Sequence, residues 1–211
     1  MKPIVKLVSA WAAFEDLYPN GTIEDFCKHH LALQTEKKQV EPLFDGEIPP
    51  RPDIILTKML DRFARMHRVY IQLAMKGLKI RHFEEFNLLS AIANLENPRK
   101  TDVIYHTIIE LSTGLNLLSA LKKRGYITEQ TDPDDKRSIR LGLTARGEKI
   151  LYTCYERFSK VPELLFMDMS TDDIGQCIQL LKDIDFKFSK LWLHHKTIPF
   201  DQVYDLMTNK I

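Results

Sequence analysis

The residues best suited to chemistry with a partner molecule lie between positions 112 and 124. Four short polar side chains recur there, largely at helical spacing: Ser112, Thr113, Asn116 and Ser119. A carboxamide can form two hydrogen bonds with the edge of an adenine base. The segment ends in Lys122, Lys123 and Arg124, and basic side chains favour the end of a helix and can reach phosphate groups. The pattern predicts a helix that enters the major groove of double-stranded DNA.

A second group of candidate contacts follows in the polar segment 130–138. This segment is rich in turn-forming residues and lies between two short runs of strand character, 126–129 and 139–143. It is therefore predicted to be the tip of a hairpin, and it carries Lys136 and Arg137. An arginine at such a tip can enter the narrow, negatively charged minor groove. Arg140, on the second strand, is a further predicted DNA contact.

The elements that must position these residues are mostly helices. Apolar residues recur at intervals of three and four along most of the chain, which is typical of amphipathic helices. The predicted helices span 4–17, 22–38, 53–74, 83–95, 101–108, 112–124, 144–159 and 170–195. The residues predicted to cap helix N-termini are Thr22, Asp53, Thr101, Thr144 and Ser170. The fold class is mainly α, with a two-stranded β-hairpin.

Proline content marks one boundary in the chain. The segment 40–53 holds four of the ten prolines, and proline lacks the N–H donor that a helix or a central strand requires. We interpret residues 1–50 as a helical extension followed by a linker. Residues 51–211 form the main region. Its helices at 101–108 and 112–124, with the hairpin after them, predict a winged helix–turn–helix over about 80–146, between helical segments at about 53–77 and 144–196.

Composition limits the class of protein. The chain has 211 residues, 44% of them hydrophobic, and a formal net charge of +1. The charge is segregated, because residues 51–149 carry 18 basic and 12 acidic side chains (+6) and the remainder carry 12 and 17 (−5). A basic middle fits an anionic partner such as DNA. No apolar run is long enough to span a bilayer, and no leader peptide is recognisable, so we expect a cytoplasmic protein.

Other kinds of site are weakly supported. Metal ligands must converge in space, and nothing in the sequence brings Cys27 and His30 together with the pair His194–His195. Cys154 and Cys177 fall in predicted helices, where a buried thiol is the usual occupant, so a redox switch is not favoured. No enzyme motif is found, and neither a metal nor a cofactor is predicted. The aromatic residues of the extension are expected to pack its helices onto a dimer; they are Trp11, Phe14, Tyr18, Phe26 and Phe44.

Three consecutive blocks carry a resemblance to a known family. The blocks are LKKRGYI at 121–127, DPDDKRS at 132–138 and LGLTARG at 141–147. In this order they resemble the wing signature of MarR-type regulators, and EFNLLSAI at 85–92 is similar to the helix that precedes the family's helix–turn–helix. The resemblance covers about residues 53–196. It implies a homodimeric transcription factor, usually a repressor, whose N- and C-terminal helices form the dimer, and in which Asp135 positions Arg137 against DNA.

The resemblance also implies a near-palindromic operator and release by a small-molecule effector. Two positions depart from the family pattern. Glu110 stands where the family often has a small polar residue, and Gly114 stands where it usually has an apolar one. Because no arginine occupies the groove-facing positions, base reading is predicted to rest on Asn116. The alternative hypothesis is a winged-helix module that binds proteins and has lost DNA binding.

Overall fold

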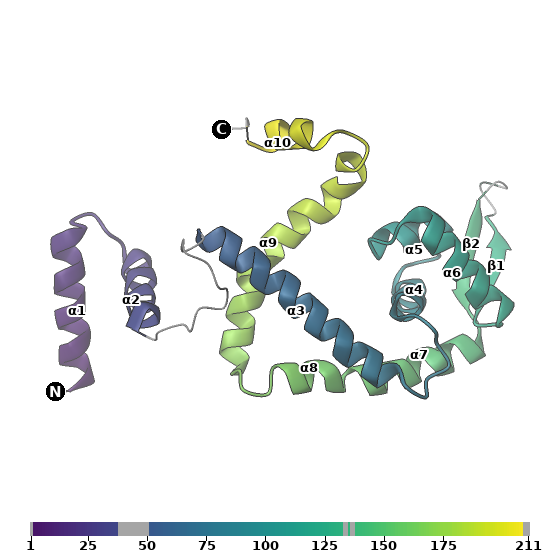
Figure 1. The fold of residues 1–211 in the computed structure, drawn as a ribbon, viewed down its shortest axis with the longest axis horizontal. Coiled ribbons are helices and arrows are strands. Elements are labelled where there is room, and N and C mark those ends of the chain that lie inside the picture. The colour runs from purple at the N-terminus through teal and green to yellow at the C-terminus, as the bar shows by residue number, and fades with distance from the viewer. Residues whose placement is uncertain (1, 38–50, 133–134, 136–137, 209–211) are drawn as a thin grey trace. The chain divides into compact units, whose positions relative to one another are not determined.

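The structure, a computed structural model, describes residues 2–37, 51–132, 135 and 138–208 (Figure 1). The chain divides into two compact units, residues 1–55 and 56–211. Each unit has its own packed interior, and each is described separately. None of the helices in the described ranges combines the length and the apolar character needed to cross a lipid bilayer.

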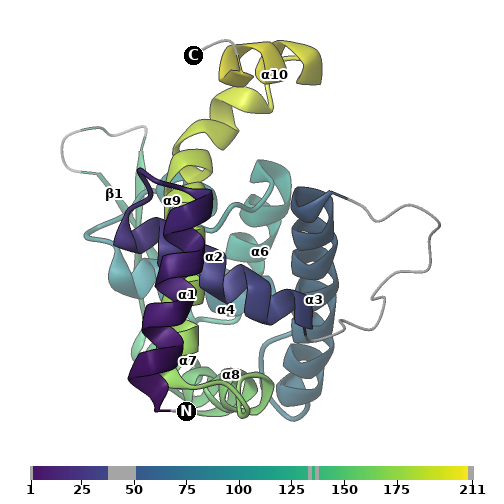
Figure 2. The same cartoon turned by 90° about the vertical axis from the view of Figure 1, so that its left-hand side faces the viewer.

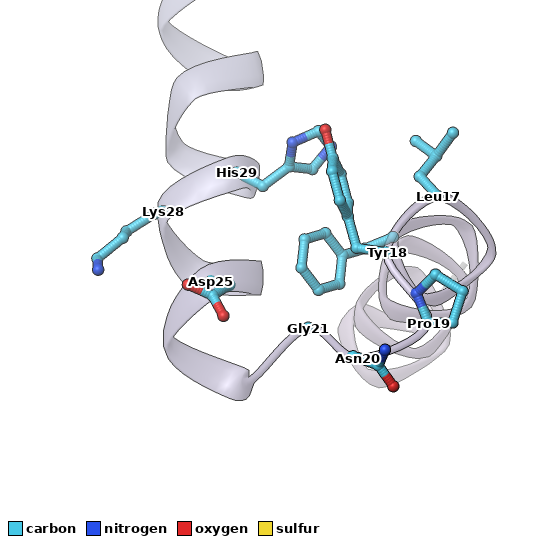
Figure 3. A pocket seen from close by; sticks show the side chains of 9 residues that line it. Leu17, Tyr18, Pro19, Asn20, Gly21, Asp25, Lys28 and His29 are labelled. Carbon is cyan, nitrogen blue, oxygen red and sulfur yellow. The ribbon is translucent and has the colours of Figure 1, made fainter.

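The first unit is a pair of helices, α1 (Pro3–Leu17) and α2 (Ile23–Lys37), joined by a short turn (Figure 2). Phe14 and Phe26 are buried between them, with their ring centroids 5.6 Å apart. A Cβ atom on Gly21 would lie 2.6 Å from the Phe14 ring, so the turn requires glycine at this position. A small hollow lined by Tyr18, His29 and neighbouring residues lies beside the turn (Figure 3). Trp11, Phe14, Tyr18 and Phe26 thus pack the two helices against each other. Phe44 lies outside the described residues, and packing of this unit onto a dimer stays a prediction.

The second unit contains the remaining helices and a two-stranded sheet (Figure 1). Its elements are α3 (Pro52–Met75, with its first turn assigned to the first unit), α4 (Phe83–Asn94), α5 (Lys100–His106), α6 (Leu111–Lys123), β1 (Ile127–Thr131), β2 (Ile139–Leu143), α7 (Ala145–Phe158), α8 (Lys160–Leu165), α9 (Thr171–His195) and α10 (Phe200–Thr208). The two strands pair in antiparallel register, with Ile127 opposite Leu143 and Thr131 opposite Ile139. The predicted fold class, mainly helical with a two-stranded hairpin, is confirmed.

The main core lies where α4, α5 and α6 meet the hairpin and α7. Leu88, Val103, Ile104, Leu118 and Leu121 are almost completely buried there. A second cluster, around Ile71, Cys154 and Phe158, joins α3 to α7 and α8; Phe83 and Phe86 pack against it. The main core holds α6 and the hairpin together, and the second cluster attaches α3 and α8 to α7.

Most local predictions are confirmed by the hydrogen bonds at helix ends. The hydroxyls of Thr144 and Ser170 accept bonds from the N–H groups of Gly147 and Asp173, and Thr22 caps α2 in the same way. The predicted caps at Asp53 and Thr101 are wrong, because α3 and α5 begin one residue earlier and both side chains lie inside the first turn. Helix α10 was not predicted, and most of the predicted linker lies outside the described residues.

Gly114 is explained by the packing of α6 on α5. Its position is buried, and a Cβ atom there would lie 2.6–2.9 Å from three side-chain atoms of Ile104, which is itself fully buried. We expect Gly114→Ala to lower the free energy of unfolding by about 1–3 kcal/mol, although alanine is the better helix former. Chemical denaturation measures this change. The control is Gly175→Ala in α9, where the added Cβ meets no neighbour; equal effects of the two changes would contradict the packing argument.

Candidate nucleic-acid interface

Helix α6 presents a polar stripe. Ser112, Asn116, Ser119 and Lys123 follow one another at intervals of three and four residues, and all are exposed, as is Thr113 beside them. Gly114, Leu118 and Leu121 occupy the opposite side of the helix and are buried in the core. In the described part of the chain, the side chains of Asn116, Ser119 and Lys123 form no intramolecular hydrogen bond. Their donors and acceptors are therefore available to a partner.

Lys122 lies at the end of this helix but already has a partner. Its ammonium nitrogen is 2.6 Å from Glu129 on β1, and the other carboxylate oxygen of Glu129 is 2.8 Å from the ammonium of Lys100 on α5. Burial alone would raise the pKa of Glu129, but the hydrogen bonds from both lysines outweigh it and hold the pKa below the usual value. The charged Glu129 thus joins α5, α6 and the hairpin.

The end of α6 is anchored by a buried ion pair. The guanidinium of Arg124, the C-cap residue, lies 2.6 Å from a carboxylate oxygen of Glu85 on α4. Glu85 is only 1% exposed, and its second oxygen accepts a hydrogen bond from the N–H of Arg81 at 2.9 Å. Arg124 also donates to the carbonyls of Ala120 and Lys79. These contacts set the position of α6 relative to α4.

A third carboxylate, that of Asp132, directly follows β1 at the end of the hairpin nearest its tip, and it is 1% exposed. One of its oxygens lies 2.7 and 2.6 Å from two guanidinium nitrogens of Arg140 and 3.4 Å from Arg99. Arg140 donates a further bond to the carbonyl of Asn97 at 2.7 Å. The Asp132 N–H donates to the carbonyl of Ser138 and closes the hairpin where its tip begins. This cluster fixes the direction of the hairpin.

The predicted contact residues therefore differ in their surroundings. The α6 residues are exposed, whereas the guanidinium of Arg140 binds the buried carboxylate of Asp132. Asp135 is half-buried, and its carbonyl accepts a bond from the Ser138 N–H at 2.8 Å. Lys136 and Arg137 lie outside the described residues. Sequence reasoning missed Glu85, Glu129 and Asp132, because no local pattern distinguishes a buried acidic residue from an exposed one.

Cys154 lies behind the interface, in the second core cluster, and is 1% exposed. Burial raises the pKa of its thiol from 9.0 to about 11, and the nearby Glu85 carboxylate contributes. We expect a thiol-alkylating reagent at pH 7.5 to modify the exposed Cys27 quickly and Cys154 only after unfolding. Rapid labelling of Cys154 in the folded protein would contradict this. The free energy of unfolding should fall as pH rises from 9 to 11, because the thiol ionises first in the unfolded chain. Cys154→Ala should make this fall smaller, since it removes one of the groups that ionise in this range.

These features define the class of protein. A short helix, a tight turn, a helix with an exposed polar stripe and a two-stranded hairpin together form a winged helix–turn–helix. The family model for the winged helix DNA-binding domain matches residues 84–147, which contain all of these elements. In the described ranges, no group of three or more histidine, cysteine or acidic side chains is arranged to hold a metal ion.

Known proteins similar to this chain agree with that class. The HTH-type transcriptional regulator Hpr of Bacillus cytotoxicus is 27% identical over 78 residues, which are 37% of this chain and 42% of that protein. The crystal structure of a MarR-family transcriptional regulator from Rhodococcus sp. RHA1 matches with a TM-score of 0.59 and 17% identity, over 66% of this chain and 98% of that one. The regulator BpsR of Bordetella bronchiseptica, whose DNA binding is regulated by 6-hydroxynicotinic acid, matches with a TM-score of 0.56 and 20% identity, over 61% and 97%.

The chain contains a winged helix domain that the family model matches, and its fold is similar to that of MarR-family regulators. The resemblance inferred from the wing signature is confirmed, since the matched region includes the α6 stripe and the hairpin. The curated relative is matched over less than half of its own length. The two structural neighbours, at 17% and 20% identity, show the fold.

Proposed function

We propose that this protein is a transcription regulator that binds a pseudo-palindromic DNA operator as a homodimer and acts as a repressor. The observation that carries the proposal is the exposed polar stripe of α6, which the ion pair of Lys122 with Glu129 joins to the hairpin. Its carboxamide and hydroxyl groups suit the base edges of a major groove. The preceding helix α5 and the wing lie beside it, where phosphate contacts are made.

Unpartnered apolar surface supports the homodimer. Helix α9 has 25 residues and none is buried, although Ile178, Leu180, Phe186 and Phe188 are apolar. Helix α3 likewise exposes Leu56, Met59, Leu60, Val69 and Leu73. Exposed apolar side chains in this number are typical of a surface that binds another protein. A second copy of the chain would cover both helices and hold two α6 helices for half-sites about one turn of DNA apart.

A cavity between α3 and the helix–turn–helix supports control by an effector. It has a volume of about 820 Å³ and is lined by residues of α3, the α3–α4 connection and the α5–α6 turn. Its charged side chains are mainly basic, with Arg68, Lys76 and Arg81 against one carboxylate, Glu84. Ile71, Met75 and Phe83 supply apolar surface. The lining suits a small organic anion with an aromatic or apolar body.

The cavity is also lined by Ile108, which lies in the turn between α5 and α6. Ile108 adopts a positive φ of 54°. A β-branched residue is strained in that region, so the surrounding structure must hold it there. An effector that repacks Ile108 would favour a different position of α6 and weaken DNA binding by its differential affinity for the two states.

The experiment that tests the main proposal is selection of bound sequences from a random DNA pool. We expect an enriched site with two related half-sites, and affinity that falls steeply with salt as counterions are released. Analytical ultracentrifugation of the protein and its complex measures the number of copies. Negligible affinity for any DNA at low salt would favour a protein-binding module instead.

Asn116 supplies the sharpest test of base reading. We expect Asn116→Ala to relax the base preference at one position in each half-site, at a cost of about 1–3 kcal/mol. Lys123→Ala is the matched control on the same stripe, because loss of a phosphate contact weakens binding equally for all sequences and reduces the salt dependence. Binding of both variants to a panel of operator sequences distinguishes a loss of base preference from a uniform loss of affinity. An unchanged preference profile in Asn116→Ala would contradict a reading role.

The effector proposal is tested with 6-hydroxynicotinic acid as a probe anion and its uncharged amide as the control. We expect the acid, and not the amide, to raise the thermal unfolding temperature and to release operator DNA, because only the acid pairs with the basic lining. Arg81→Ala should reduce both responses. A probe that stabilises the protein without releasing DNA would contradict the proposed coupling.

A further inference from the structure

A negatively charged side chain lies at the N-terminus of α6, the proposed DNA-reading helix. Glu110 is the residue directly before α6, and its side chain, 64% exposed, does not cap the helix. The first turn of a helix presents free N–H groups and a positive dipole end, which attract phosphate. An unpaired carboxylate at this point would repel the DNA backbone from the same groups.

The structure pairs this carboxylate with a lysine from the other end of the unit. The ammonium nitrogen of Lys196 lies 2.8 and 3.2 Å from the two carboxylate oxygens of Glu110. Lys196 directly follows α9, and its backbone N–H donates to the carbonyl of Trp192 at 3.0 Å. The position of the ammonium group is therefore set by the end of α9.

An aromatic contact holds the end of α9 beside the helix–turn–helix. The ring of Trp192 lies nearly perpendicular to the ring of Tyr105 on α5, with centroids 6.1 Å apart. The Lys196 ammonium lies 5.3 Å from the centroid of the Trp192 ring, which favours its charge further. Tyr105 on α5 and Glu110, the N-cap residue of α6, thus contact Trp192 and Lys196 at the C-terminal end of α9.

From this geometry we infer that Lys196 is a positioning residue for DNA binding, which acts by neutralising Glu110. With the pair formed, the first turn of α6 accepts a phosphate without a competing carboxylate. Because the lysine is carried by α9, one of the helices expected to form the dimer, the charge at the reading helix also depends on where α9 lies. The inference rests on the proposed DNA-binding function and adds a control of the same surface.

A double-mutant cycle on the full-length protein tests the inference. The operator selected above is titrated at about 0.05 and 0.3 M salt with wild type, Lys196→Ala, Glu110→Gln and the double variant. We expect Lys196→Ala to weaken binding about five-fold at the lower salt and less at the higher salt, because the pair is partly exposed and screened. Glu110→Gln should bind at least as tightly as wild type, and the double variant should return to within two-fold of it. Lys182→Ala, also on α9, is the control and should leave affinity unchanged.

The outcomes separate the two proposals. If wild type binds DNA and Lys196→Ala binds equally well, the inference is wrong and the proposed function stands. If the loss in Lys196→Ala persists in the Glu110→Gln background, Lys196 contacts phosphate itself or only supports the fold, and charge neutralisation is overturned. If wild type binds no DNA at low salt, the proposed function fails and the inference fails with it.

Discussion

Replacement of Glu85 by alanine is expected to lower the free energy of unfolding by about 3–5 kcal/mol, the cost of leaving a charged partner without its counterion in the protein interior. Glu85 is 1% exposed and is the carboxylate that neutralises Arg124 at the end of α6. The change also removes the acceptor of the Arg81 N–H, so a second, partly buried group loses its hydrogen bond. Urea denaturation followed by circular dichroism measures the loss.

The chain offers a matched control one residue away. Glu84 lies on the same helix and is exposed, so Glu84→Ala should change stability by less than about 0.5 kcal/mol. The double replacement Glu85→Leu with Arg124→Met should recover much of the loss, because two apolar groups of similar size leave no buried charge unpaired. A loss in Glu85→Ala no larger than that in Glu84→Ala would show that the ion pair does not hold α6.

The second large effect is expected in the wing, where its tip begins. Asp132→Asn keeps the side chain's shape but removes the charge that holds Arg140 and Arg99. We expect operator affinity to fall at least ten-fold, because the hairpin no longer holds its tip in one direction, and tenfold corresponds to about 1.4 kcal/mol. Electrophoretic mobility shift at several salt concentrations measures the loss.

The direction of this change separates two roles for Arg140. If Arg140 anchors the wing, Asp132→Asn weakens binding. If Arg140 instead contacts phosphate, as the sequence predicted, removal of its acidic partner frees the guanidinium and tightens binding. Thr131→Ala, an exposed change on the adjacent strand residue, controls for disturbance of the hairpin and should leave affinity near that of wild type.

Both predictions concern carboxylates that hold the reading surface without forming part of it. Glu85 fixes one end of α6, and Asp132 fixes the hairpin beside it. Glu129, which binds Lys100 and Lys122, joins α5 and α6 to the hairpin. The interface is therefore a set of exposed polar groups on a frame of internal ion pairs, which keeps its geometry independent of the partner.

The sequence by itself determined the order and bounds of most elements, because apolar periodicity and N-capping are local properties. Thr144 and Ser170 cap helices where their residue types predict it. The polar stripe on α6 was also readable, since a helix of known phase assigns each residue to a side. Helix α10 was missed although Phe200, Val203, Tyr204 and Met207 recur at helical spacing.

Only the tertiary structure decided which charges face a partner and which are used internally. Arg140, Lys122 and Arg124 look alike in the sequence as basic residues near a DNA-reading helix, yet each is bound to a different acidic residue. The two departures from the family pattern were likewise explained only in three dimensions, Gly114 by Ile104 and Glu110 by Lys196. The physical reason is that an ion pair or a close contact joins residues distant in the chain, and its energy depends on their separation and burial, which periodicity does not encode.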